Sequence, residues 1–147
     1  MRSLRAGPGG ERGSAVVEFL GVSLVLLVPL VYLILTMAHI QAATFAAEGA
    51  AREAGRLIAQ ADTLAEGAQA AHLGVEVAFA DQGLEVDGED VLTISCPDSD
   101  CTTAQYVLVS VDTEVSLPLT PDFLAGSAPT SVSISADAMT AISGFRD

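Results

Sequence analysis

An uninterrupted apolar run near the N-terminus most constrains how this chain can fold. From Phe19 to Ala38 the residues are apolar apart from Ser23 and Thr36, and none of them is Lys, Arg, Asp or Glu. About twenty residues is the length at which a helix, rising 1.5 Å per residue, crosses a hydrocarbon core. The run therefore predicts a transmembrane helix, which we assign to residues 14–40. A buried core helix of a soluble domain is the weaker alternative, because such helices usually keep one polar stripe.

The charges around the run predict its orientation. Three arginines precede it, whereas the next arginine along the chain is Arg52, and the part that follows is acidic. By the positive-inside rule, residues 1–13 form a cytoplasmic basic leader and the remainder is extracytoplasmic. The sequence thus predicts a single-pass protein of the cell membrane. A secretory signal peptide is the alternative, with cleavage near Ala42 and Ala43 giving a freely secreted product.

A short motif stands at the start of the run. In the segment ERGSAVVEF, Gly13 precedes Ser14, and Glu18 lies five residues past the glycine, directly before Phe19. A carboxylate at the edge of a membrane span is costly in lipid and usually has a partner or a function. This pattern resembles the type III signal of type IV pilin-like proteins, in which a prepilin peptidase cuts after the glycine and leaves glutamate at the fifth mature position.

The motif, the Leu/Val run and the later AAREAGR at residues 50–56 together resemble the TadE-like family of tight-adherence pilus assembly proteins. The resemblance covers about residues 10–60. It implies a membrane-anchored minor pilin or pseudopilin that presents a small extracytoplasmic domain. Its implied partners are the membrane, a prepilin peptidase, and other pilin-like subunits or pilus assembly proteins. Gly13 and Ser14 would be the processing residues, and Glu18 would form a charge pair with the new Ser14 ammonium, or a neighbour's, during assembly.

The helix is expected to continue beyond the membrane, and residues 41–80 are predicted to be an extracytoplasmic helical region. Residues 41–60 lack proline and are dominated by alanine. Small side chains recur every fourth residue in two adjoining ridges, and the positions expected to pack are Ala42, Ala46, Ala50, Ala54 and Gly55. Such a face lets another backbone approach closely. Two partners remain open, a helix of an assembly complex or this protein's own sheet.

Two further segments follow this helix. Asp62 is expected to cap a second helix over residues 63–80, which the sequence Asp81-Gln82-Gly83 ends. Residues 84–90 (LEVDGED) are then expected to form an acidic turn that leads into a strand.

The final third changes from a helical period to a period of two. Apolar residues alternate with polar ones at 92–95, 107–117 and 132–138, which predicts three half-buried strands within residues 81–147. One face of this sheet must be covered, and the helices of residues 41–80 are the candidate cover. The predicted fold class is α+β, in which a transmembrane helix continues into a helix packed on a small antiparallel sheet. This is also the layout that the pilin-like resemblance implies.

The two cysteines are expected to form a disulfide at a hairpin tip. Cys96 and Cys101 enclose four residues, whereas a redox motif would enclose two, and structural zinc would need two more nitrogen or sulfur ligands nearby. An extracytoplasmic location permits the bond. Because the enclosed loop is short, the bond should contribute at the low end of the disulfide range.

Composition limits the remaining functional classes. The formal net charge of −13, with no lysine, argues against a nucleic-acid partner. No sequence motif of a nucleophile, phosphate loop or metal site is found, so we expect no catalytic residues, metal or cofactor. The clustered carboxylates at residues 85–90 and at Asp98 and Asp100 are interpreted as a solvated rim, and a calcium site is the weaker alternative, since the residues of an EF-hand loop are not in register. A structural subunit of a pilus or secretion system is the leading hypothesis. A membrane-tethered or secreted binding module is the alternative, and an enzyme is a distant third.

Overall fold

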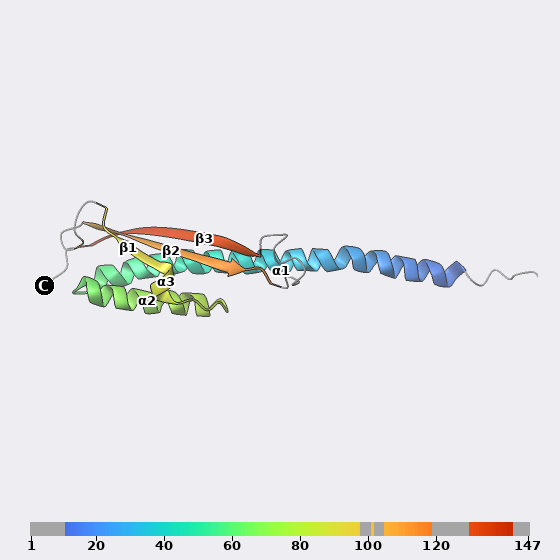
Figure 1. The fold of residues 1–147 in the computed structure, drawn as a ribbon, viewed down its shortest axis with the longest axis horizontal. Helices are drawn as coiled ribbons and strands as arrows, with labels where there is room; N and C mark the ends of the chain where they lie inside the picture. The colour runs from blue at the N-terminus through green and yellow to red at the C-terminus, as the bar shows by residue number, and fades with distance from the viewer. Residues whose placement is uncertain (1–10, 98–100, 102–104, 119–129, 143–147) are drawn as a thin grey trace, which may run out of the picture. The chain divides into compact units, whose positions relative to one another are not determined.

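The protein has an α+β fold, with a long apolar N-terminal helix and a small three-stranded antiparallel sheet (Figure 1). The computed structural model describes residues 11–97, 101, 105–118 and 130–142. Two compact units are distinguished, residues 1–37 and residues 38–147. The helical region 41–80 and the strands therefore belong to one unit, which we call the head.

Helix α1, Glu11–Gln60, is a single helix of 50 residues. It continues through Pro29, which is tolerated in apolar spans where neighbouring groups replace the lost hydrogen bond. The helix begins at Glu11, so Gly13 lies in its first turn, whereas we predicted the leader to extend to residue 13. Residues 1–10 of that leader lie outside the described part of the chain.

Helix α2 spans Leu64–Ala80. Its N-cap lies one residue later than predicted. The N-cap is Thr63 and not Asp62, because Thr63 has extended backbone angles and its hydroxyl accepts a hydrogen bond of 3.2 Å from the Glu66 amide. Thr63 and Glu66 have the spacing of a capping box, in which a glutamate three residues after the cap faces back toward it. This spacing was present in the sequence and is the better signal for the boundary.

The end of α2 is fixed by its backbone. The Leu84 amide donates to the Phe79 carbonyl at 3.0 Å, and the Gly83 amide donates to the Ala80 carbonyl at 2.9 Å. This pair of bonds is a Schellman motif, and it requires the positive φ of 72° that Gly83 adopts. The predicted end of the helix at residues 81–83 is confirmed.

The acidic segment after α2 does not form the predicted turn. Its second half is a short helix, α3, Gly88–Val91, whose N-cap Asp87 accepts a 2.9 Å hydrogen bond from the Glu89 amide. The Asp-Gly pair that we interpreted as a turn is instead a cap followed by the first helical residue. Gly88 lies against the backbone of His72, where an added Cβ would approach the carbonyl carbon to 2.8 Å.

Three strands form an antiparallel sheet in the order β1-β2-β3: β1, Leu92–Ser95, β2, Tyr106–Ser116, and β3, Ser131–Ala141. Each was predicted from its alternating pattern. The register pairs inward-facing residues with one another, such as Val111 with Leu92 on one side and with Ala136 on the other. The opposite face is mostly Ser, Thr and Asp and is largely exposed.

Helices α1 and α2 cover the inner face of the sheet with a single hydrophobic core. The core combines small side chains from α1 with larger ones from α2 and the sheet, and its buried members include Ala43, Ala46, Ala47, Ala50, Ala51, Ala54, Ile58, Ala71, Val75, Phe79, Val107, Val109, Val111 and Ile134. Alanines on α1 let the valines of β2 come close to the helix backbone. The alanine ridges are therefore complementary to the β-branched face of the sheet.

A glycine on α2 tests this close packing. An alanine Cβ at Gly67 would lie 2.9 Å from the Ile58 Cα and 3.1 Å from the Ala61 Cβ, whereas at Gly49 it would meet nothing within 4 Å. We expect Gly67→Ala to lower the free energy of unfolding by about 1–3 kcal/mol. Gly49→Ala should raise it by roughly 0.5–1 kcal/mol through helix propensity. Denaturant unfolding of the full chain in detergent measures both, and equal effects would contradict the described contact between α1 and α2.

Candidate functional site

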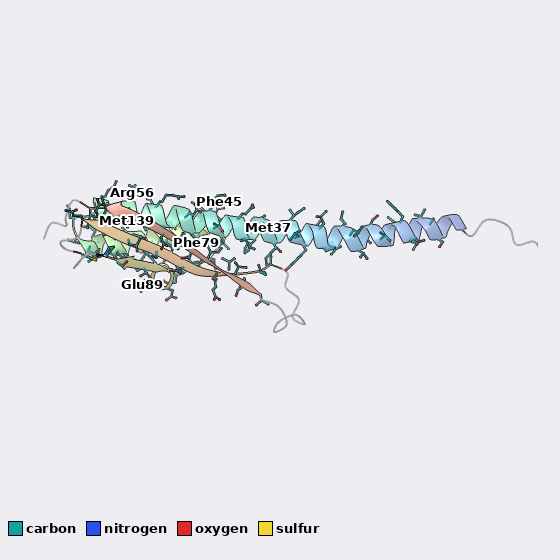
Figure 2. All side chains as sticks on the ribbon, turned by 90° about the horizontal axis from the view of Figure 1, so that it is seen from above. Met37, Phe45, Arg56, Phe79, Glu89 and Met139 are labelled. Carbon is teal, nitrogen blue, oxygen red and sulfur yellow. A yellow bond between two sulfur atoms is a disulfide. The ribbon has the colours of Figure 1, made fainter. Side chains whose placement is uncertain are left out.

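The N-terminal segment of α1 carries an extensive exposed apolar surface. Sixteen large hydrophobic side chains between Val16 and Met37 are each 44–72% exposed, and in Figure 2 side chains project from both sides of this segment. Soluble monomers rarely expose contiguous apolar patches of more than a few hundred Å². By length and composition this helix is able to span a membrane, which fits a single-pass membrane protein.

The predicted processing and charge residues lie at the start of this apolar segment. Gly13 and Ser14 are in the first turns of α1, and Ser14 is exposed. Glu18 is also exposed and forms no ion pair within the part of the chain that the structure describes. In lipid, an ionised carboxylate in this position needs a cationic or hydrogen-bonding partner.

The predicted helix-packing residues lie in the core of the head. Ala46, Ala50 and Ala54 are between 0% and 4% exposed, Gly55 is buried, and Ala42 is half-buried. Gly55 approaches the sheet closely, because a Cβ at this position would contact the Thr140 hydroxyl and lie 3.3 Å from the Thr140 Cβ. Of the two partners left open by the sequence, the protein's own sheet is the one that the structure places against this face.

The outer side of α1 carries two ion pairs. Arg52 lies 3.5 Å from Glu48, as the spacing of four residues predicts, and Arg56 donates to Glu53 with an Nε to Oε2 distance of 2.8 Å. The hydrogen bond from Arg56 lowers the pKa of Glu53. The pair therefore stabilises the fold above the ordinary carboxyl pKa, and this contribution is lost as pH falls through the lowered pKa. With side chains 52% and 43% exposed, the contribution is small.

The predicted disulfide is present. Cys96 and Cys101 are bonded, with their Cα atoms 5.3 Å apart. The bond lies in the connection between β1 and β2, and Cys96 packs against the core of the head. It therefore closes a short loop directly after β1, since Cys96 follows the last residue of that strand and Cys101 lies five residues before β2.

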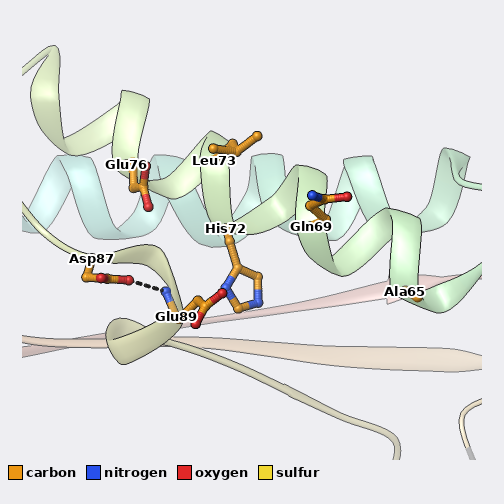
Figure 3. A pocket seen from close by; sticks show the side chains of 7 residues that line it. All are labelled: Ala65, Gln69, His72, Leu73, Glu76, Asp87 and Glu89. Atoms are coloured by element: carbon orange, nitrogen blue, oxygen red, sulfur yellow. Dashed lines mark hydrogen bonds between the residues drawn. The ribbon is translucent and has the colours of Figure 1, made fainter.

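An open pocket of about 690 Å³ lies between α2 and α3 and was not predicted (Figure 3). Glu76 accepts a 3.2 Å hydrogen bond from the Gly88 amide, which ties α3 to α2. The Nδ1 atom of His72 is buried and has no hydrogen-bond partner in the described structure. No group of three or more His, Cys, Asp or Glu residues suited to a metal ion occurs among the described residues. The pocket is lined by one face of α2 and by residues at the start of α3, all within residues 65–89, and these residues carry no motif that marks a site in the sequence.

The alanine face can be tested by overpacking. Ala50 is fully buried, so Ala50→Leu inserts three carbon atoms into a filled core and should lower the free energy of unfolding by about 1–3 kcal/mol. Ala65→Leu, on the exposed side of α2, is the control and should change it by less than about 0.5 kcal/mol. If Ala50→Leu left stability unchanged but prevented complex formation, the face would pack against a partner instead of the sheet.

Comparisons with protein-family models, curated proteins and solved structures find no match for this chain. The resemblance of residues 10–60 to the TadE-like family therefore rests on the residues quoted for it.

Proposed function

We propose that this protein is a membrane-anchored minor pilin or pseudopilin of a tight-adherence, type IV-like pilus assembly or secretion system. The protein would be a structural subunit or would assist assembly, and it would not act as a catalyst. The head is extracytoplasmic and pilin-like, and the N-terminus is cytoplasmic. The partners are other pilin-like subunits or pilus assembly proteins, together with a prepilin peptidase that acts between Gly13 and Ser14.

One observation carries this proposal. Glu18 lies near the start of a helical segment with sixteen exposed large apolar side chains, and it has no ion-pair partner among the described residues. A plain anchor gains nothing from such a charge, since an ionised group at the edge of the hydrocarbon costs free energy. A subunit that must recognise a neighbour within the membrane does gain, because the charge is neutralised only when the correct partner is present. Cleavage after Gly13 would supply a cation, the Ser14 ammonium.

The continuity of α1 also supports the proposal. The same helix that carries the apolar segment supplies the alanine face on which the sheet of the head packs. A helix that first carries an apolar segment and then packs on a small sheet is the layout that the pilin-like resemblance implies.

Orientation can be tested through the cysteines. If the head is extracytoplasmic, a membrane-impermeant maleimide applied to intact cells should label Cys96 and Cys101 only after treatment with a reductant. The oxidising compartment keeps the bond formed, and the thiols are reachable without permeabilisation. Labelling that requires permeabilised cells would reverse the proposed orientation.

Processing and assembly can be separated with two substitutions. Gly13→Leu should leave an uncut precursor, since a bulky side chain replaces the hydrogen at the proposed cleavage site. Glu18→Val should still insert and still be cut, but it should no longer join its complex, because assembly needs a charge partner in lipid and insertion does not. Ser23→Val, another polar-to-valine change in the same run, is the matched control and should assemble normally.

Mass spectrometry of the membrane-extracted protein and co-purification of its partners give the readouts. A mature N-terminus at Ser14 supports the proposal. A start near Thr44 would indicate a secreted product, and an intact chain would indicate a plain anchor. Normal assembly of the Glu18→Val variant would remove the charge-pair mechanism.

A further inference from the structure

The side of α1 that faces away from the core of the head carries an aromatic residue and two cations. At about 100° per residue, five exposed residues fall within a sector of roughly 80°, and we call them the outer ridge: Gln41, Phe45, Glu48, Arg52 and Arg56. Phe45 is 69% exposed, although it is large and apolar. Arg52 and Arg56 are the only arginine or lysine residues in the described part of the head. The outer ridge therefore holds the cations that can meet an acidic surface.

The two arginines differ in how firmly their own helix holds them. Arg56 donates hydrogen bonds of 2.8 Å to Glu53 and of 2.8 Å to Gln60. Arg52 lies 3.5 Å from Glu48, and its side chain is 68% exposed and donates no hydrogen bond to any described residue. A guanidinium carries five N–H donors in a fork that matches a carboxylate. Arg52 is therefore the cation that is available to a partner.

The exposed side of α2 is apolar at its centre. Five exposed residues fall within a sector of roughly 80°, and we call them the outer face of α2: Glu66, Gln69, Leu73, Val77 and Ala80. Leu73 is 58% exposed and Val77, one helical turn further, is 60% exposed. Aromatic and arginine side chains are the residues most enriched in protein interfaces, and they need such apolar surface beside them.

The pocket between α2 and α3 adjoins this outer face and holds negative charge. Gln69 and Leu73 of the outer face line it together with Glu76, Asp87 and Glu89 (Figure 3). None of these three carboxylates forms an ion pair with a described residue. The pocket has a volume of about 690 Å³, which admits an arginine side chain. The apolar centre of α2 is thus bordered by an acidic hollow.

Charge decides how these two surfaces can meet. Figure 2 shows Phe45 and Arg56 on one side of the head and Glu89 on the other, so one copy presents both surfaces at once. Two copies anchored in one membrane lie in parallel. Outer ridge on outer ridge would then set Arg52 beside Arg52, and outer face on outer face would set carboxylates together, where like charges repel. Outer ridge on outer face instead brings opposite charges together, with apolar residues on both sides of the contact.

We propose that the outer ridge of one copy docks on the outer face of α2 of a second copy. Arg52 enters the pocket and meets its three carboxylates, while Phe45 packs on Leu73 and Val77. Because the two surfaces differ, the contact is heterologous and can repeat from copy to copy. This inference rests on the proposed function in that both copies are anchored in one membrane. It adds a second copy as the partner and puts the contact in the head, away from Glu18.

Photo-crosslinking of the full chain in native membranes tests the contact. A benzophenone amino acid replaces Phe45 in a tagged copy, which is co-expressed with an untagged copy. We expect a product of two copies whose crosslink, located by mass spectrometry, lies in α2 of the untagged copy. The same amino acid at Ser133, which is exposed on β3, is the control and should give none of this product.

Two matched substitutions on the outer ridge test the charge. Arg52→Gln should lower the yield of the Phe45 product by roughly fivefold, the effect of losing one important interface side chain. Arg56→Gln removes the same charge from a residue that its own helix already holds, and should change the yield by less than about twofold. Equal yields from the two variants would contradict the assignment of Arg52 to the pocket.

Two further substitutions test the apolar part of the contact. Val77→Ser should also lower the yield of the Phe45 product by roughly fivefold. Met139→Ser, at a residue of β3 that is 64% exposed, is the matched control and should leave the yield unchanged. Both side chains are more than half exposed, so the head should stay folded in both variants. An unchanged yield with Val77→Ser would show that the outer face of α2 is not the acceptor.

The remaining outcomes separate this inference from the proposed function. A Phe45 product that joins two outer ridges, joins a different protein or contains only lipid would overturn the docking contact. Each of these could occur while Glu18→Val still blocks assembly, and the proposed function would then stand. A ridge-to-face product from a chain whose N-terminus is uncut, and whose Glu18→Val variant assembles normally, would support the contact and count against the proposed function.

Discussion

Helix α1 carries apolar side chains that need two different surroundings, one along its N-terminal segment and one along its C-terminal half. The rest of the structure depends on this difference. Between Val16 and Met37 large apolar side chains cover nearly every side of α1, a pattern that only a uniformly apolar surrounding can satisfy. From Ala43 to Ile58 the buried residues are mostly alanine and lie on one face, where they meet the sheet. The change from large residues on all sides to small residues on one side marks where lipid would give way to protein as the solvent of the helix.

The helices and strands of the head pack closely, because small residues and not large side chains lie at their contacts. Gly55 lies against Thr140 of β3, Gly67 against Ile58 of α1, and Gly88 against the backbone of His72. At each of these contacts a methyl group would collide with a neighbouring element. A small domain has little core volume, so tight packing of helices on a valine-rich sheet face compensates for the small size of the alanines. The disulfide between Cys96 and Cys101 then ties the connection of β1 and β2 to this core.

Much of this could be predicted from residue patterns, and the misses have local causes. The apolar run, the alternating strands and the disulfide were predicted because each reflects a strong period or a covalent constraint. The cap at Thr63 was missed because Asp62 and Thr63 are both good capping residues, and only Glu66, three residues after Thr63, distinguishes between them. The helix at residues 88–91 was missed because Asp-Gly favours both turns and caps. The partner of the alanine face could not be decided, since a small-residue ridge fits a helix or a sheet equally well.

The central claim is that α1 passes from lipid into protein between Met37 and Ala43. A nitroxide scan of the full chain in lipid bilayers, with single introduced cysteines and the native disulfide intact, tests this most directly. From Phe19 to Met37 every position should collide more often with oxygen than with a water-soluble relaxant, whichever side of the helix it occupies. Beyond Ala43 accessibility should follow a period of 3.6 residues, with exposed Phe45 reaching water. A 3.6-residue period of water access across residues 19–37 would contradict the account, since it would describe an amphipathic helix of a soluble assembly.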